Sequence, residues 1–215
     1  SHGIGLQVTI DANGELTSSY QGDSSRAKLP EIPACVGRAA HWAQVTQNPL
    51  EVESEPVDAP VLMTSEGFSP LFSMVVPPAL TGEKMVRKES FWSDRMEQQV
   101  LNETLTVVDD GLLEGGMSSG SRDAEGVPRQ RRTLIENGRL CSMLWSTRDA
   151  AQQVAEGRID VAASTGSASS GGHQAPPSTG CTELFLTSSK PGRSQHDLLE
   201  TMQEGYIVNS VMGAH

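Results

Sequence analysis

The sequence predicts an α+β fold: a bent, mostly antiparallel sheet or open barrel with several helices packed on it. One basis is a series of short alternating segments joined by tight turns, the clearest of which is Asn137-Gly138. Both residues tolerate the positive φ that a two-residue hairpin requires, and a hairpin pairs its strands in antiparallel fashion. A second basis is composition. Aromatic residues make up only 4% of the chain while Gly, Ser and Pro are plentiful, which indicates a loop-rich domain.

The N-terminal segment is predicted to begin inside a sheet. Residues Leu6–Ile10 alternate as a strand, residues 11–14 form a turn, and Glu15–Tyr20 pairs back on the first strand. Apolar residues recur at helical spacing over Ala34–Val45, and Asn48-Pro49 ends this helix.

A short strand and a short helix are expected next. Val61–Met63 reads as the strand, and Ser69 is the expected N-cap of the helix, with Pro70 at its first position. The helix should end early at Pro77-Pro78, since a proline interrupts the hydrogen bonding of a helix interior. A further short helix is expected between residues 83 and 100.

The central segment predicts a hairpin. Thr104–Val108 alternates as a strand that Asp109-Asp110-Gly111 should stop, and Arg131–Glu136 and Arg139–Trp145 should pair across the Asn137-Gly138 turn. The remaining expected elements follow in chain order: a helix over Thr147–Ala155 capped by Ser146, a long flexible loop over 164–180, a strand over Cys181–Thr187, a helix over His196–Glu204 and a strand from Tyr206 to Val208.

Charge and cysteine spacing exclude several classes of protein. The net charge of −11 argues against a nucleic-acid binder, and the basic cluster Arg129, Arg131 and Arg132 is expected on a solvated strand face. No apolar run approaches the ~20 residues of a membrane span, so the predicted location is the cytoplasm, away from membranes. Cys35 and Cys141 lie far from any partner in sequence, which indicates neither a disulfide framework nor a cysteine zinc site.

The loop from Glu114 to Gly126 and one cysteine supply the candidate chemistry. Its glycines could cradle a phosphate, but no Lys-Ser/Thr pair follows as a P-loop requires. Asp123 and Glu125 could be a carboxylate pair for acid/base work or a metal, although such residues beside a Gly-Val-Pro turn more often accept hydrogen bonds from the turn. Cys181 with His173 is a weaker candidate for a nucleophile and its base.

The string that runs from Asp109-Asp110 through this loop to Asp-x-Glu-Gly-Val-Pro and Leu-Ile-Glu-Asn-Gly-x-Leu resembles the TldD/PmbA family, the "modulator of DNA gyrase" proteins. The resemblance continues in order over nearly the whole chain. Its further segments are residues 1–3, 60–62, 80–83, 164–167, 205–208 and 211–215. It marks as signature residues Asp109, Asp110, Gly116, Asp123, Glu125 and Gly126, which it places in a structural role near a subunit cleft.

The resemblance also bears on metal binding. Members of the TldD branch carry His-Glu-x-x-x-His on the helix after the Val61 strand, and those positions hold Phe72, Ser73 and Pro77 here. Phenylalanine and proline side chains offer zinc no donor atom, and a serine hydroxyl cannot replace the carboxylate as a general base. The chain therefore resembles the PmbA branch, also called TldE, with no cofactor of its own and zinc expected on a TldD-like partner.

The resemblance implies a role in proteolysis. It predicts a metal-free subunit of a TldD/TldE-type metalloprotease, which holds extended or unfolded peptide for a TldD-like subunit or acts within a homo-oligomer. The alternatives are a peptidase with divergent catalytic residues, namely Cys181 or Asp123 with Glu125, and a non-catalytic interaction module. In this comparison residues 1–215 form one C-terminal domain, truncated at both ends, that lacks the family's N-terminal α/β domain and last strands.

Overall fold

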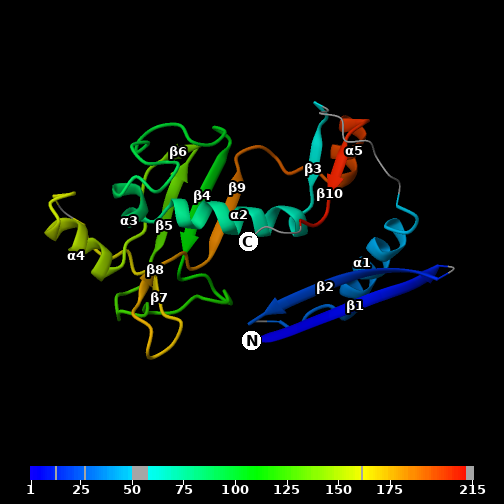
Figure 1. The fold of residues 1–215 in the computed structure, drawn as a ribbon, viewed down its shortest axis with the longest axis horizontal. Coiled ribbons are helices and arrows are strands. Elements are labelled where there is room, and N and C mark those ends of the chain that lie inside the picture. Colours follow the sequence, from blue (N-terminus) through cyan, green and yellow to red (C-terminus); the bar gives the residue numbers. More distant parts are fainter. Residues whose placement is uncertain (13, 27, 50–57, 161, 212–215) are drawn as a thin grey trace. The chain divides into compact units, whose positions relative to one another are not determined.

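The computed structural model describes the chain except residues 13, 27, 50–57, 161 and 212–215 (Figure 1). It divides into two compact units, one formed by Ser1–Val57 with Gly115–Met117 and the other by Asp58–Glu114 with Ser118–His215. Within the described residues, none of the helices has both the length and the apolar character needed to cross a bilayer.

The first unit is a long hairpin with one helix packed on it. β1 (His2–Ala12) and β2 (Glu15–Ser25) pair in antiparallel register, and α1 (Ile32–Val45) lies against both strands. The helix buries three small side chains, Cys35, Ala39 and Ala43, which follow its helical period. The predicted hairpin and helix are confirmed, although β2 runs on to Ser25, beyond the predicted strand Glu15–Tyr20.

The largest sheet of the second unit is antiparallel throughout and has the order β6-β5-β4-β9. Its strands are β4 (Leu105–Asp110), β5 (Arg131–Glu136), β6 (Arg139–Leu140) and β9 (Leu184–Ser188). Asn137 and Gly138 adopt φ of 48° and 77°, as the predicted hairpin turn requires. β6 is shorter than predicted because the regular pairing ends after Leu140: Cys141 and Ser142 both donate to the Leu134 carbonyl, and Leu144 donates to that of Leu80.

The core of this unit lies between that sheet and the helices that cover one face. α2 (Ser65–Ala79) and α3 (Gly82–Val86) contribute Val76, Ala79 and Met85, and the Leu80 that joins them is fully buried. The sheet contributes Val107, Leu134, Ile135 and Leu140 to the same cluster. α2 is therefore anchored by its inner side, and its outer side faces away from the core.

The boundaries of α2 differ from the prediction. The helix begins at Thr64, whose hydroxyl accepts a hydrogen bond from the Gly67 amide at 3.2 Å, and not at Ser69. Pro70, Pro77 and Pro78 all lie inside it, so the helix continues past the proline pair expected to end it. Two sequence-compatible caps lie five residues apart here, and the one selected also contacts the Asn209 side chain at 3.0 Å.

The remaining elements include one exact match and two unexpected pairings. α4 (Thr147–Ala155) begins as predicted, with the Ser146 hydroxyl accepting from the Asp149 amide at 3.0 Å. β3 (Val61–Met63) pairs in parallel with β10 (Tyr206–Val208). β7 (Ala168–Ser169) pairs with β8 (Ser178–Thr179) inside the segment 164–180. The last helix is α5 (Gln195–Met202).

The chain thus has the predicted α+β class. Its strands pair mostly in antiparallel fashion, and they are distributed over one four-stranded sheet and several two-stranded pairs, which leaves the main sheet open. The predicted fold class is confirmed. The main sheet stays open and does not close into a barrel among the described residues.

Candidate functional site

A groove of about 550 Å³ runs between α2 and β9 in the second unit. It brings together residues that lie more than a hundred positions apart in the sequence. Its walls are formed by Phe68, Ser69, Phe72, Ser73 and Pro77 from α2, and by Cys181, Thr182, Leu184 and Leu186 from β9 and the segment before it. All three positions that replace the metal motif, Phe72, Ser73 and Pro77, therefore lie in one groove.

One wall of the groove is a sheet edge. β9 is the last strand of the main sheet within the described residues. The Asp110 amide donates to the carbonyl of Glu183, and the Ser189 amide donates to that of Thr104. Since backbone groups alternate along an antiparallel strand, the N–H and C=O of Leu184 and Leu186 point away from β4. These groups are free to pair with another extended chain.

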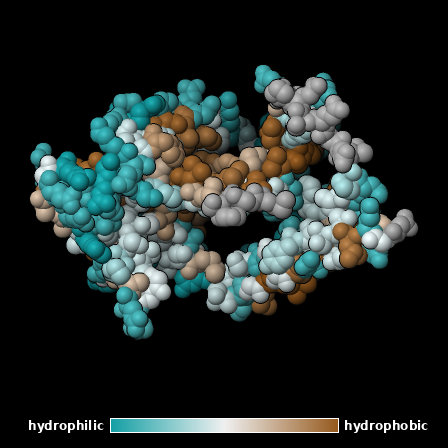
Figure 2. All heavy atoms as spheres, viewed as in Figure 1, coloured by the Kyte–Doolittle hydropathy of each residue, from teal (hydrophilic) through white to brown (hydrophobic). Residues whose placement is uncertain are grey.

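The other wall of the groove carries an unusual helix surface. Pro77 has no amide hydrogen, so it cannot donate the normal helical hydrogen bond to the carbonyl of Ser73. That carbonyl belongs to a residue that lines the groove. The outer side of α2 is also apolar, with Met74 and Val75 each 43% exposed, and Figure 2 shows hydrophobic residues gathered along it.

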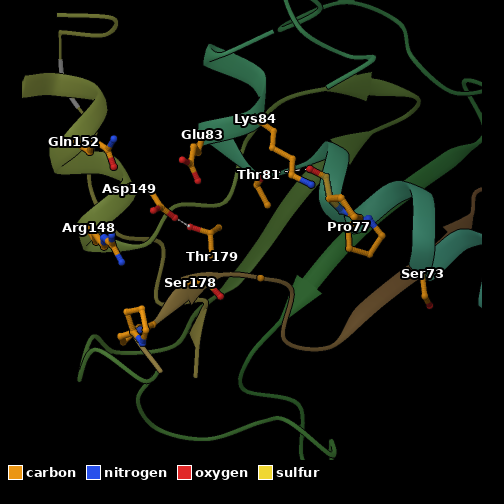
Figure 3. Close-up of a pocket in the computed structure, with 14 residues that line it drawn as sticks. Ser73, Pro77, Thr81, Glu83, Lys84, Arg148, Asp149, Gln152, Ser178 and Thr179 are labelled. Atoms are coloured by element: carbon orange, nitrogen blue, oxygen red, sulfur yellow. Dashed lines mark hydrogen bonds between the residues drawn. The ribbon is translucent and has the colours of Figure 1, made fainter. Parts of the chain in front are cut away.

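A second cavity, here called the cleft, has a volume of about 540 Å³ and adjoins the end of α2 (Figure 3). It shares Ser73 and Pro77 with the groove. Its other lining residues come from the end of α2 and α3 (Pro78, Thr81, Glu83, Lys84), from α4 (Arg148, Asp149, Gln152) and from the segment Pro176, Pro177, Ser178, Thr179 and Gly180. Groove and cleft are thus two cavities with one common boundary.

Asp123 is buried and its carboxylate is fully engaged by the backbone. Oδ1 accepts from the amides of Glu125 and Val127, each at 2.9 Å, and Oδ2 accepts from the amide of Ala168 at 3.0 Å. Asp123 thus closes the turn at the end of the loop from Glu114 to Gly126, here called the signature loop, and ties that loop to β7. With both oxygens occupied by amides, Asp123 is a structural residue in this geometry.

Glu125 acts on the start of α4. Its carboxylate accepts from the Thr147 amide at 2.6 Å and from the Arg148 amide at 3.4 Å. Together with the Ser146 hydroxyl, which accepts from Asp149, it satisfies the free amides of the first helical turn. The candidate pair Asp123 and Glu125 therefore binds two different backbone segments, and the structure gives it no shared substrate-facing position.

Asp109 fixes the entry into β9. Its buried carboxylate accepts from the amides of Thr182 at 2.6 Å and Glu183 at 3.0 Å. Burial raises the pKa of Asp109, and the two amides and the nearby Arg129 partly oppose that effect. Arg129 also donates to the Thr182 hydroxyl at 2.8 Å and is half-buried before β5, so its predicted position on a solvated strand face was wrong. These contacts set the path of the segment that lines the groove.

Asp110 and the signature glycines have local roles. Both aspartates extend β4, whose turn begins only after them, and the Asp110 carboxylate accepts from the Leu112 amide at 3.0 Å. Gly126 has a φ of 80°, which closes the turn that Asp123 stabilises. Gly116 belongs to the first unit.

Cys181 lines the groove, but its chemistry is unfavourable for a nucleophile. Burial raises the pKa of its thiol to about 12, and the Asp109 carboxylate adds to the effect. At neutral pH the group is therefore a thiol, and the thiolate is the reactive form. The proposed partner His173 lies on an exposed part of the segment 164–180, and no hydrogen bond joins it to Cys181 among the described residues.

The groove does not suit a zinc ion. Of the three residues at the motif positions only Ser73 has a side-chain oxygen, and zinc in proteins is held by several Cys, His or carboxylate ligands. Within the described ranges, no group of three His, Cys, Asp or Glu side chains is arranged to hold a metal. The donor set around Phe72 and Pro77 thus disagrees with the metal site of the TldD branch.

The comparisons with known proteins agree with the family resemblance that the signature loop indicates. The model of the PmbA/TldA metallopeptidase C-terminal domain matches residues 56–215, which include all of the second unit. The chain belongs to this family. Metalloprotease PmbA of Escherichia coli O157:H7 is 30% identical over 145 residues, which cover 66% of this chain and 32% of that protein.

Two further relatives match almost the whole chain. The metalloprotease TldD homolog of Buchnera aphidicola subsp. Schizaphis graminum is 28% identical over 216 residues, 95% of this chain and 43% of that protein. The crystal structure of TldE from Thermococcus kodakarensis superposes with a TM-score of 0.84 at 23% identity, over 98% of this chain and 46% of that one. The chain spans less than half the length of each, and the structural likeness shows a shared fold.

The cleft is what sequence reasoning missed. Lys84, Arg148 and Thr179 come from three separate segments, and none of them stands in a recognisable motif. The only sequence signal nearby was the Ser146 cap, which placed the start of α4 correctly but not what α4 faces.

Proposed function

We propose that this chain is a metal-free, PmbA/TldE-like subunit of a two-subunit metalloprotease, and that it holds extended peptide for cleavage by a metal-bearing TldD-like subunit. The observation that carries the proposal is the groove between α2 and the edge of β9. The family supplies the link to proteolysis, and the replacement of the metal motif by Phe72, Ser73 and Pro77 supports a role other than metal binding.

The groove suits a main chain better than a particular side-chain sequence. On one side Leu184 and Leu186 offer outward backbone N–H and C=O groups, and on the other the Ser73 carbonyl lacks its helical donor. A peptide added to a sheet edge gains affinity from main-chain hydrogen bonds. The apolar walls of Phe68 and Phe72 would cover the added strand on one face.

The binding step can be tested with a short, unstructured, fluorescently labelled peptide and the chain alone. We expect saturable binding by fluorescence anisotropy. Leu186→Pro should weaken it about tenfold, because the variant removes an outward amide without removing a hydrogen bond to β4. Leu186→Ala separates the loss of the side chain from that of the amide. Ser188→Pro is the matched control, since Ser188 also points its amide outward but lies outside the groove.

The division of labour can be tested by mixing. The pure chain should not cleave the peptide with or without added zinc, whereas cleavage should appear once a metal-bearing TldD-like relative is present. Zinc-dependent cleavage by the pure chain would overturn the proposal, and so would equal affinity of the Leu186→Pro and Ser188→Pro variants.

A further inference from the structure

The cleft contains two cations without a carboxylate partner. Among the ion pairs of the described residues, neither Lys84 nor Arg148 takes part. The acidic residues of the cleft are already engaged. Glu83 pairs with Arg87 at 3.0 Å, and Asp149 accepts a hydrogen bond from the Thr179 hydroxyl at 2.5 Å. Each carboxylate of the cleft thus has a partner, whereas neither cation has an ion pair among the described residues.

The two cations lie on different walls. In Figure 3, Lys84 extends from α3 toward Pro77 at the end of α2, while Arg148 lies on α4 beyond the hydrogen bond between Asp149 and Thr179. The lining of the cleft holds two cations and two carboxylates in a chain with 27 acidic and 16 basic residues, and the two cations are without an ion pair among the described residues. An anionic group that enters the cleft therefore meets a cation on either wall.

The amides of the α4 N-terminus are not the source of this capacity. Those of Thr147 and Arg148 already donate to Glu125, and that of Asp149 donates to Ser146. Anion binding at a helix start relies on free amides, so here the side chains of Lys84 and Arg148 must provide it.

The remaining walls of the cleft suit a chain rather than a small ion. Pro77 and Pro78 line one part, and Pro176 and Pro177 line another. Proline rings are apolar and rigid and bring no amide donor, so these walls can contact hydrocarbon without a change in their own conformation. The cleft volume of about 540 Å³ exceeds what a single carboxylate fills, which leaves room for the residue that carries it.

The position of the cleft connects it to the groove. Ser73 and Pro77 line both cavities, so the groove along β9 and the cleft have a common boundary at the end of α2. We propose that the cleft binds the C-terminal carboxylate of a peptide held in the groove, with Lys84 and Arg148 as its anchoring residues. This inference rests on the proposed peptide-holding function and narrows its substrate class to peptides with a free C-terminus.

The test compares three peptides of one neutral sequence, each labelled at its N-terminus: a free acid, a C-terminal amide, and an amide whose last residue is replaced by glutamate. Affinities are measured by anisotropy on the intact chain. We expect the simple amide to bind about tenfold more weakly than the acid, because it loses charge-assisted hydrogen bonds. Lys84→Met and Arg148→Gln should each weaken binding of the acid and leave that of the amide unchanged.

Lys190→Met is the control variant, because it removes the same charge at an exposed position outside both cavities. Both cleft cations are exposed, so thermal melting should show that every variant folds. Equal affinity for acid and amide would overturn the inference and leave the groove intact. Failure of all three peptides to bind would overturn the peptide-holding function itself. If the glutamate amide alone restored affinity, the cleft would recognise an acidic side chain and the assignment to the C-terminus would be wrong.

Discussion

Two signature carboxylates, Asp109 and Asp123, and the cations of the cleft all belong to the second unit, but their polar groups behave in opposite ways. Asp109 in β4 and Asp123 in the loop 114–126 are buried, and their carboxylates accept hydrogen bonds from backbone amides. At the cleft, Lys84 and Arg148 are exposed and unpaired within the described residues. These signature residues therefore hold the backbone in shape, while the side chains proposed to bind a ligand lie on elements without a recognisable motif.

The largest effect should come from the one thiol of the groove. With a pKa of about 12, Cys181 holds a far smaller thiolate fraction at neutral pH than an ordinary cysteine. We expect its alkylation by iodoacetamide in the folded chain to be about a thousandfold slower than in the chain unfolded by urea. Peptide mapping by mass spectrometry at timed intervals measures the rate. A rapid reaction in the folded chain would support Cys181 as a nucleophile and would contradict the assignment of reactive groups to the cleft alone.

Removal of the Asp123 carboxylate, which accepts three backbone amides, should have the next largest effect, on the free energy of unfolding. Asp123→Ala leaves the amides of Glu125, Val127 and Ala168 without their acceptor, and should lower the free energy of unfolding by about 3 kcal/mol. Asp110→Ala is the control, because the Asp110 carboxylate accepts from the Leu112 amide and otherwise pairs only loosely with Arg131, at 3.7 Å. Its expected cost is about 1 kcal/mol. Urea unfolding followed by circular dichroism gives both values, and similar costs would contradict a structural role specific to Asp123.

A backbone contact beside the signature loop provides a third test. Gly166 has a φ of 70°, and a Cβ added there would lie 2.1 Å from the carbonyl oxygen of Pro128. Gly157 has a similar φ of 67° and no atom within 4 Å of the added Cβ. Gly157→Ala should therefore cost about 1 kcal/mol for the left-handed backbone alone, and Gly166→Ala about 2 kcal/mol or more. Differential thermal melting of the two variants isolates the steric part.

The smallest effect concerns pH. Burial raises the pKa of Asp109 above 3.8, so its contribution to stability is fully present below that value and is lost as the pH rises through the folded-state pKa. Asp109→Asn retains an oxygen for the Thr182 and Glu183 amides but cannot ionise. The stability of the parent chain relative to this variant should therefore fall as the pH rises from 3.8 toward neutrality. Urea titrations over that range measure the difference, and the opposite slope would show that hydrogen bonding outweighs burial at this carboxyl.

Elements set by local signals could be predicted from the sequence. α4 begins at its predicted serine cap, and Asn137-Gly138 forms its predicted turn, because the deciding interactions span only a few residues. The predicted start of α2 was wrong because Thr64 and Ser69 are both acceptable N-caps. Contacts with Asn209, after β10, favour Thr64. The pairing of β7 with β8 was missed because their Ser-rich segments lack an alternating apolar pattern.

The site was harder to predict than the fold. The signature residues were found, but their partners were not, because Asp109 and Glu125 bind amides 73 and 22 positions away. The cleft is formed by side chains of three segments that meet only in the folded unit. Residue types such as Lys84 and Arg148 are common on any surface, and only their shared cavity and their lack of partners distinguish them.

The parallel pairing of β3 with β10 has a consequence for how the chain matures on the ribosome. Thr64, which starts α2, also binds Asn209, 145 positions later. At a synthesis rate of about 5–20 residues per second, β3 waits roughly 7–30 s for its partner strand. During that interval Val61 and its neighbours form an unpaired edge, to which other nascent chains can add. A chaperone that covered this early segment until β10 emerged would prevent such pairing.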